Sequence, residues 1–385
     1  MKRLKALSVA IILSLVISST FLHFYTKKEK KEFDELSVQN NSIRYNDSPN
    51  KYKSHDAIIK NIGKGTIILL GSSELIVTND WKEHPKQFLD YSDRNIMQIG
   101  EGFYQSIIQA ITLGSIGEKS PVKTVNLILS MQWFEKNGMS PEAFQPRFSI
   151  DHLYNLYKNK KISKETKEKI YNRILELSKN NNIVTGIVER LKRDNPVDKT
   201  INNANAEKYK LIANSKFLKS YHRDDSINDK KAPERFDWEK LRKEALDTAK
   251  EESNENKFFM YNKYFDKNFR KNFAKLKNSA KNTKYRSEEE YRDLQLFLDV
   301  ARDLGFKVNL ILVPLQGHWA DYTGVPKDEI EYFYKRIRDI SAKNNVNLID
   351  YSKYSYTKYF FKDATHLGRL GLLQLQEDLL KYNND

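Results

Sequence analysis

Five short apolar segments constrain the fold of this chain more than any other feature. Each has the composition of a strand that is buried on both faces, and each leads into a loop. They are Thr66–Leu70, Asn95–Ile99, Thr124–Ser130, Lys307–Val313 and Val346–Ile349. Helical patterns lie between them, over Gln105–Leu113, Glu288–Leu304 and Glu329–Asn344. Because strands that alternate with crossover helices form parallel sheets, the sequence predicts an α/β fold with a doubly wound parallel sheet.

The alternation stops between the third and fourth segments. Residues 140–285 read as almost wholly helical, with charged faces and aromatic stripes, and we expect a helical insertion there. Residues 32–60 are polar and rich in asparagine without a sustained period, which is typical of a juxtamembrane spacer. The predicted organisation is an anchor with a basic flank over 1–31, a spacer over 32–60, and an α/β domain over 61–385 that carries the insertion.

The N-terminus has the pattern of a membrane segment. Lys2, Arg3 and Lys5 precede an uncharged run from Ala6 to Leu22, which is long enough to span a bilayer. The run is longer than the apolar part of most signal peptides, and its small-residue cleavage pattern is poor. We therefore expect an uncleaved, single-pass anchor in the cell membrane. Basic residues flank both ends, so charge gives little contrast for orientation, and we expect the domain outside the cell.

Composition excludes several classes of site. The chain of 385 residues has no cysteine, which excludes disulfides, a thiol nucleophile and thiolate metal sites. Its seven histidines show none of the paired spacings of zinc sites, so we predict neither a metal nor another cofactor. The net charge of +15, combined with a membrane tether, favours an anionic membrane surface or cell-wall polymer as partner over nucleic acid.

A basic segment from Lys263 to Arg286 has nine Lys/Arg against the single acid Asp266, and aromatic residues are interleaved with them. One interpretation is a solvated helix face whose aromatic residues pack inward. The other is a docking surface for anionic lipid headgroups or a polyphosphate backbone. The pattern alone does not separate the two.

A candidate nucleophile follows the first apolar segment, in Gly71-Ser72-Ser73-Glu74-Leu75. Open parallel sheets keep their chemistry at the carboxyl ends of their strands, and a serine that starts a helix there can point its own N–H at an oxyanion. Glycine and serine after a strand also make simple turns. Ser73 is favoured over Ser72, because Gly-x-Ser resembles the order found in small serine esterases of the SGNH type.

A candidate acid and base lie near the C-terminus. Asp363 and His366 are three residues apart, so the carboxylate can meet one imidazole nitrogen while the other nitrogen takes a proton from Ser73. A surface pair or a helix cap is the alternative. The motif follows the last strand, and it resembles the acid and base of SGNH esterases in place, order and spacing.

Two further loops lie where oxyanion donors are needed. Gly102 follows the second strand, and its amide can approach a substrate oxygen closely; Gly100 is the less favoured choice. After the third strand, the side chain of Gln132 can donate a second hydrogen bond. The adjacent Trp133 is either a wall of the substrate cleft or ordinary core.

The whole chain resembles the DltD family, the membrane-anchored proteins of teichoic acid D-alanylation in Gram-positive bacteria. The resemblance covers residues 1 to about 372 and rests on the anchor and four motifs: Gly71–Leu75, Gln132-Trp133-Phe134, Pro314–Gly324 and Lys362–Gly368. It implies an SGNH-hydrolase-like, flavodoxin-like sheet and an outward-facing Ser-His-Asp site. It also implies a substrate cleft lined by Ser72, Trp133, His318 and Trp319. Met131, Arg369 and Leu372 depart from the family pattern.

Three functions follow as hypotheses. The first is an acyltransferase in which Ser73, His366 and Asp363 move D-alanyl esters onto hydroxyls of lipoteichoic acid, with an acyl-carrier protein or membrane O-acyltransferase as partner. The second is a thioesterase or esterase, in which water is the acceptor. The third is a non-catalytic scaffold for other D-alanylation proteins, against which an intact triad argues.

Overall fold

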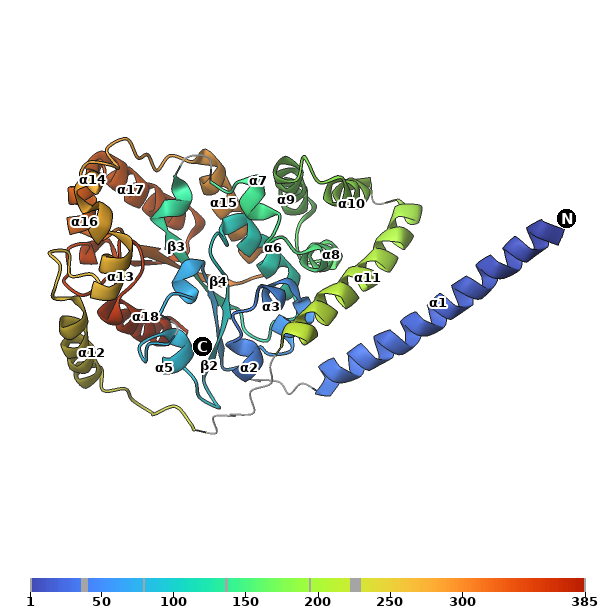
Figure 1. The fold of residues 1–385 in the computed structure, drawn as a ribbon, viewed down its shortest axis with the longest axis horizontal. Coiled ribbons are helices and arrows are strands. Elements are labelled where there is room, and N and C mark those ends of the chain that lie inside the picture. Colours follow the sequence, from blue (N-terminus) through green and yellow to red (C-terminus); the bar gives the residue numbers. More distant parts are fainter. Residues whose placement is uncertain are drawn as a thin grey trace.

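The computed structural model describes residues 2–35, 41–78, 80–135, 138–193, 195–221 and 230–383, and its centre is a five-stranded, all-parallel sheet (Figure 1). The strands are β1 (Thr66–Leu70), β2 (Asn95–Ile99), β3 (Thr124–Ser130), β4 (Lys307–Val313) and β5 (Asn347–Asp350). Four have the predicted bounds, and β5 begins one residue later than predicted. The strand order β2-β1-β3-β4-β5 is that of flavodoxin-like sheets. The predicted α/β fold with a parallel sheet is therefore confirmed.

Helices cover both faces of the sheet, which explains why the strands are apolar throughout. Ile68 and Leu70 belong to a core shared with three helices, and Ile67 and Leu69 belong to a second core on the opposite face. The first face carries α6 (Ser106–Ile116), α15 (Glu288–Asp303) and α17 (Lys327–Asn344). The second face is covered by α18 (Arg369–Tyr382).

Asparagine side chains lock the register of three neighbouring strands. Asn309 Nδ2 donates to Asn126 Oδ1 at 2.8 Å, and Asn347 Nδ2 donates to Asn309 Oδ1 at 2.9 Å. The three residues are direct partners in the parallel ladder. A shift of one residue would turn these amides to the other face and leave buried polar groups unpaired. The similar segments at Val125–Leu129 and Val308–Leu312 are thus equivalent buried strands.

The chain between β3 and α15 is mostly helical. Its elements are η2 (Met131–Phe134), α7 (Pro141–Phe144), α8 (Ile150–Lys158), α9 (Lys164–Leu177), α10 (Asn182–Arg193), α11 (Pro196–Ser220), α12 (Trp238–Ser253), α13 (Asn262–Asn268), η3 (Arg270–Asn272) and α14 (Phe273–Leu276). Leu153, Ile170 and Ile187 from α8–α10 belong to the core that contains Ile68. These helices extend the layer formed by α6 and α15.

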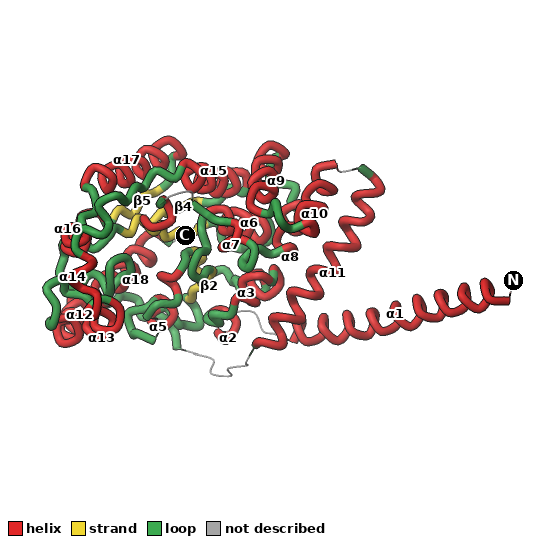
Figure 2. Tube along the Cα trace, turned by 45° about the horizontal axis from the view of Figure 1, so that its top comes forward, coloured by secondary structure: helices red, strands yellow, loops and turns green. Residues whose placement is uncertain are grey.

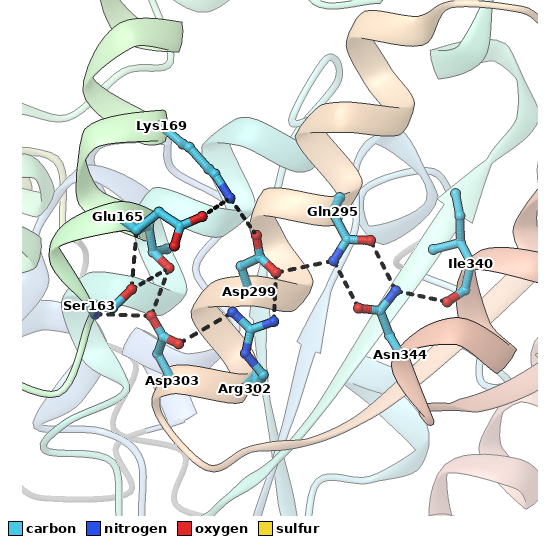
Figure 3. A network of polar contacts seen from close by, with 10 residues as sticks. Ser163, Glu165, Lys169, Gln295, Asp299, Arg302, Asp303, Ile340 and Asn344 are labelled. Atoms are coloured by element: carbon cyan, nitrogen blue, oxygen red, sulfur yellow. Dashed lines mark hydrogen bonds and ion pairs between the residues drawn. The ribbon is translucent and has the colours of Figure 1, made fainter.

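A polar network fixes α9 to this layer (Figure 3). At the start of α9, the Ser163 N–H donates to Asp303 Oδ2 of α15 at 3.0 Å. One turn back along α15, Asp299 is 3.9 Å from Lys169 Nζ and accepts from Gln295 at 3.1 Å. Gln295 in turn exchanges amide hydrogen bonds with Asn344 at the end of α17. The network therefore joins α9, α15 and α17.

The region before β1 is folded onto the domain where the structure describes it. α1 (Lys2–Glu35) includes Val9–Phe33, which is long and apolar enough to cross a membrane. Three short helices follow: α2 (Asn41–Arg44), α3 (Pro49–Lys53) and α4 (His55–Ile59). Their Ile43, Tyr52 and Ile58 are buried. Tyr52 and Ile58 belong to the main core, and Ile43 belongs to a smaller cluster with Phe33 and Phe217. The spacer predicted over 32–60 therefore contributes apolar side chains to the packing despite its polar composition.

Glycine is required where β1 and β2 end side by side. Gly100 has φ +150°, and a Cβ atom there would lie 2.0 Å from the carbonyl oxygen of Gly71. The two loops that leave these strands can therefore approach each other only without a side chain at residue 100.

Gly100→Ala should lower the free energy of unfolding by about 2 kcal/mol or more, because the backbone conformation and the contact with Gly71 both oppose a side chain. Gly186→Ala is the matched control. Gly186 lies inside α10, and a methyl group on its Cα would meet only open space, so this change should stabilise by roughly 0.5–1 kcal/mol. Equal denaturant midpoints for the two variants would contradict the close approach.

Candidate functional site

Ser73 begins the 3-10 helix η1 (Ser73–Leu75) directly after β1, at the carboxyl edge of the sheet. Its neighbour Ser72 is turned away: the Ser72 hydroxyl donates to the Glu101 carbonyl oxygen at 3.2 Å, and its N–H donates to Glu74 Oε2 at 2.9 Å. Ser72 is 1 % exposed. The two serines of the motif therefore differ. The Ser72 side chain stabilises the loop, whereas the Ser73 side chain faces the candidate site.

His366 lies between Ser73 and Asp363. Its Nε2 is 2.9 Å from Ser73 Oγ, and its Nδ1 is 2.9 Å from Asp363 Oδ2. The backbone N–H groups of Thr365 and His366 both donate to Asp363 Oδ1 at 2.9 Å. The carboxylate thus holds its own loop and the imidazole together, and it brings the predicted serine, histidine and aspartate into one hydrogen-bonded chain.

The surroundings of these residues favour the charged pair. Burial alone raises the pKa of the Asp363 carboxyl, but the hydrogen bond and charge of His366 and the two backbone donors outweigh burial and lower it. Burial alone lowers the pKa of His366, but the hydrogen bond and charge of Asp363, with the nearby Glu74, raise it above the ordinary value of 6.5. The imidazole is thereby prepared to receive a proton from Ser73.

Backbone hydrogen bonds fix the loop that carries Asp363 and His366. Within the loop, the Lys362 N–H donates to the His366 carbonyl at 2.9 Å. From outside, the Gln316 N–H donates to the Ala364 carbonyl and the Tyr261 N–H donates to the Lys362 carbonyl, each at 2.9 Å. The loop after β4 and the start of α13 therefore support the site.

The oxyanion candidates lie on the loops that flank Ser73, since β1 is between β2 and β3 in the sheet. The N–H groups of Ser73 and Gly102 have no hydrogen-bond partner among the residues that the structure describes. Gln132 is exposed at the start of η2 (Met131–Phe134). These positions suit an oxyanion hole, and the roles of all three residues stay predictions.

The loop that contains Gly102 is held from both sides. Ser72 binds the carbonyl oxygen of the peptide before Gly102, and Arg147 Nε donates to the carbonyl oxygen of Gly102 itself. The Arg147 guanidinium also lies over the ring of Phe103, 5.0 Å from its centre, and Phe103 has the unusual φ of +67°. No sequence pattern indicated Arg147, because its contact is with the backbone of Gly102, which is 45 positions away in the sequence.

The predicted cleft residues occupy different environments. Trp133 is 2 % exposed within the main core. Trp319 belongs to an aromatic cluster and stacks on Phe269 with ring centres 4.3 Å apart. His318 is half-buried, 5.2 Å from the ring of Tyr356. Ser72 is also buried, so His318 is the most exposed of the four predicted cleft residues and the best placed to meet a ligand.

Several side chains that were not singled out from the sequence lie near His318: Phe259, Tyr356, Tyr359 and Lys358. The centre of the Phe259 ring lies 6.2 Å from that of His318, 5.5 Å from that of Tyr359 and 4.6 Å from the Lys358 ammonium.

Within the described part of the chain, no group of three or more acidic and histidine side chains has the geometry of a metal site.

The basic segment Lys263–Arg286 packs beside the loops that carry Trp319 and Ala364. Its aromatic residues Phe265, Phe269 and Phe273 pack inward on Trp319 or Phe258, as in the first interpretation of its pattern. Its lysines are exposed, among them Lys267, Lys271 and Lys275. The N–H of Tyr261, just before α13, is the donor to Lys362 noted above. A cationic surface therefore borders the loop of Asp363.

Comparisons with known proteins place the chain in a family. A family model described as DltD protein matches residues 40–384. Protein DltD of Bacillus subtilis (strain 168) is 27 % identical over 315 residues, which cover 79 % of this chain and 78 % of the relative. Protein DltD of Staphylococcus aureus is 25 % identical over 335 residues (82 % and 80 %), and that of Lacticaseibacillus rhamnosus is 21 % identical over 333 residues (83 % and 78 %). The family match spans most of the chain, and the protein therefore belongs to the DltD family.

Proposed function

We propose that the protein is a serine acyltransferase in the D-alanylation of lipoteichoic acid. The observation that carries this proposal is the position of His366, with one ring nitrogen 2.9 Å from Ser73 Oγ and the other 2.9 Å from Asp363. Membership of the DltD family ties the chain to teichoic acid D-alanylation.

The proposed reaction has two acyl transfers. Ser73 Oγ attacks the carbonyl carbon of an activated D-alanyl ester or thioester while its proton passes to His366 Nε2. The leaving group takes that proton from His366, and D-alanyl remains as an ester on Ser73. A hydroxyl of the acceptor then gives its proton to His366, attacks the ester carbonyl, and releases Ser73 as the proton returns to Oγ. Asp363 holds the imidazole and stabilises its charged form throughout.

The fold supports an SGNH-type site. The sheet has the flavodoxin-like order, Ser73 follows its first strand, and Asp363 and His366 lie together after its last strand. Ser73 N–H, Gly102 N–H and Gln132 would then stabilise the oxyanion. The charge around the site supports an anionic acceptor, because the exposed lysines of the basic segment raise the local concentration of a polyol-phosphate chain. An acyl-carrier protein or membrane O-acyltransferase would supply the acyl group.

Ser73→Ala and His366→Ala should each reduce acyl transfer roughly 10⁴- to 10⁶-fold, because a Ser-His-Asp site acts as a unit, and the double variant should be no worse. The measurements are transfer of D-alanine from a model thioester to a glycerol-phosphate oligomer, and the D-alanyl ester content of a deletion strain that carries each variant. If Ser73→Ala fully restores the D-alanyl ester content of the deletion strain, the protein acts as a non-catalytic scaffold. If the wild type releases D-alanine to water without transferring it to the oligomer, the protein is a hydrolase.

A fluorophosphonate probe provides the matched control for this experiment. It should label the wild type and Ser72→Ala but not Ser73→Ala, because the Ser72 hydroxyl is bound to Glu101 and does not face His366. Ser72→Ala should also retain its folded structure in thermal melts, since it loses one neutral hydrogen bond worth about 1 kcal/mol. Labelling that survives in Ser73→Ala would assign the nucleophile to another residue.

The pH dependence of kcat/KM should show the raised pKa of His366. The base must be neutral to accept the Ser73 proton, so the rate should rise with pH through a value above the ordinary histidine value of 6.5. Asp363→Asn removes the charge that raises this pKa, so its rising limb should move to lower pH while its maximal rate falls. An unchanged limb in Asp363→Asn would mean that another group controls the profile.

We further propose that α1 is an uncleaved anchor and that the domain lies outside the cell. Protease added to intact protoplasts should therefore degrade the domain, because residues beyond the apolar helix are on the outer side. A cytoplasmic protein should survive the same treatment. If the domain is cut only after lysis, the orientation is the reverse, and a mature protein that lacks residues 1–22 would identify a signal peptide.

A further inference from the structure

Two half-buried cationic side chains, those of Lys53 and Arg147, lie beside the loop that follows β2. Their segments are joined directly, because the Ser149 hydroxyl donates to the Lys53 carbonyl oxygen at 2.7 Å. Lys53 ends α3, and the ring of its neighbour Tyr52 lies 5.7 Å from the ring of Tyr104 in that loop. Three segments that are distant in the sequence therefore converge at the carboxyl end of β2.

Neutral groups alone hold the Arg147 guanidinium in place. Its Nε donates to the Gly102 carbonyl oxygen, its Nη1 donates to the Ala143 carbonyl oxygen at 2.9 Å, and the group lies over the Phe103 ring. By contrast, the half-buried Arg173 donates to a carboxylate from two of its nitrogens. The hydrogen bonds of Arg147 therefore orient its charge without neutralising it.

The Lys53 ammonium also lacks a close counter-ion. Among the residues that the structure describes, no carboxylate forms an ion pair with Lys53 or with Arg147. Burial lowers the pKa of Lys53; the charge of Glu101 opposes this effect, whereas the charges of Lys216 and Arg147 add to it. Three cations thus share one nearby carboxylate, and the group carries net positive charge.

This group lies on one side of Ser73, and the basic segment lies on the other. The group borders the loop after β2, whereas the basic segment packs on Trp319 after β4. In the sheet, β1 and β3 lie between β2 and β4, and Ser73 follows β1. Both views show α3 and α7 on the opposite side of the strands from α13 and α14 (Figures 1 and 2). The hydrogen bond from Ser72 to Glu101 brings the group next to the candidate nucleophile.

We infer that Lys53 and Arg147 form a subsite for a phosphodiester of the acceptor chain, with the exposed ring of Phe103 as its wall. No group in the described chain accepts from Arg147 Nη2, which leaves that nitrogen for a phosphate oxygen. The guanidinium is already fixed, so little side-chain entropy is lost when phosphate binds. Phe103, which is 60 % exposed, has a left-handed backbone with φ +67°, a strained conformation of the kind that clusters at functional sites.

This inference rests on the proposed function and makes its acceptor more specific. Each free hydroxyl of a polyol-phosphate chain lies between two phosphates. A chain that presents a hydroxyl at Ser73 therefore carries negative charge on both sides of the reacting group. The basic segment would meet one phosphate, and Lys53 with Arg147 would meet the other.

Binding of a short, unacylated, fluorescent glycerol-phosphate oligomer to the full-length protein in neutral detergent tests the subsite without requiring turnover. Lys53→Gln and Arg147→Gln should each raise the Kd roughly 10-fold, because each removes a charge-assisted hydrogen bond to phosphate. Arg147→Lys keeps the charge and should lose less. Arg292→Gln is the matched control, since Arg292 is exposed on α15 and lies 3.6 Å from Glu289; its Kd should change less than about twofold.

Lys53→Gln is the decisive variant, because its ammonium holds no part of the described chain and its loss should leave the melting temperature unchanged. An unchanged Kd in this variant would overturn the subsite. A polyglutamate that binds as tightly as the oligomer, and is weakened equally, would replace it by non-specific attraction of charge. If phosphatidylglycerol in the micelles displaces the oligomer from the wild type but not from Lys53→Gln, the site belongs to a lipid headgroup.

The same measurements separate this inference from the proposed function. If the wild type binds the oligomer through Lys53 but never transfers D-alanine to it, the acyltransferase proposal fails and the phosphate subsite remains. If the wild type transfers D-alanine and Lys53→Gln binds the oligomer normally, only the subsite fails.

Discussion

The register of the parallel sheet is the constraint on which the rest of the structure depends. The amide side chains of Asn126, Asn309 and Asn347 are paired across three strands, and they fit only one alignment. Because parallel strands all end at the same edge, that alignment decides where the following loops emerge. A sheet held only by apolar contacts would tolerate slippage more easily. Here a displaced strand would bury unpaired amides and also separate the loop after β4 from the Asp363 loop that it supports.

Charge in the site is arranged in two layers. Asp363 and the buried Glu74 both lie near one imidazole, and both favour its protonated form. The exposed surface beside them is basic, and Lys362 within the loop opposes that protonation. The inner layer therefore favours a charged imidazole, and under the proposed function the outer layer would attract anionic chains. The separation is physically consistent, because the buried charges are screened little and the exposed ones strongly.

The sequence was informative where a local pattern determines the structure. Strands buried on both faces give continuous apolar runs, so four of five strands could be placed to the residue. Asp363 and His366 are close in sequence, so their contact could also be predicted. Arg147 could not be found, since its partner Gly102 is distant and the contact is with a carbonyl oxygen. The burial of Tyr52 within a polar stretch was missed for a similar reason: one aromatic residue has no periodicity.

The order of the three site residues along the chain has a consequence for biosynthesis. Ser73 follows the first strand to leave the ribosome, whereas Asp363 and His366 come with the last twenty-odd residues, and Asn383 bonds to Asn126 at the very end of the described chain. A nascent or truncated chain therefore presents Ser73 without its hydrogen-bond partner His366. Under the proposed function, the hydroxyl would stay a weak nucleophile until the C-terminal helix closes on the sheet. If the proposed export precedes that closure, reactivity would arise only on the side of the membrane where folding is completed.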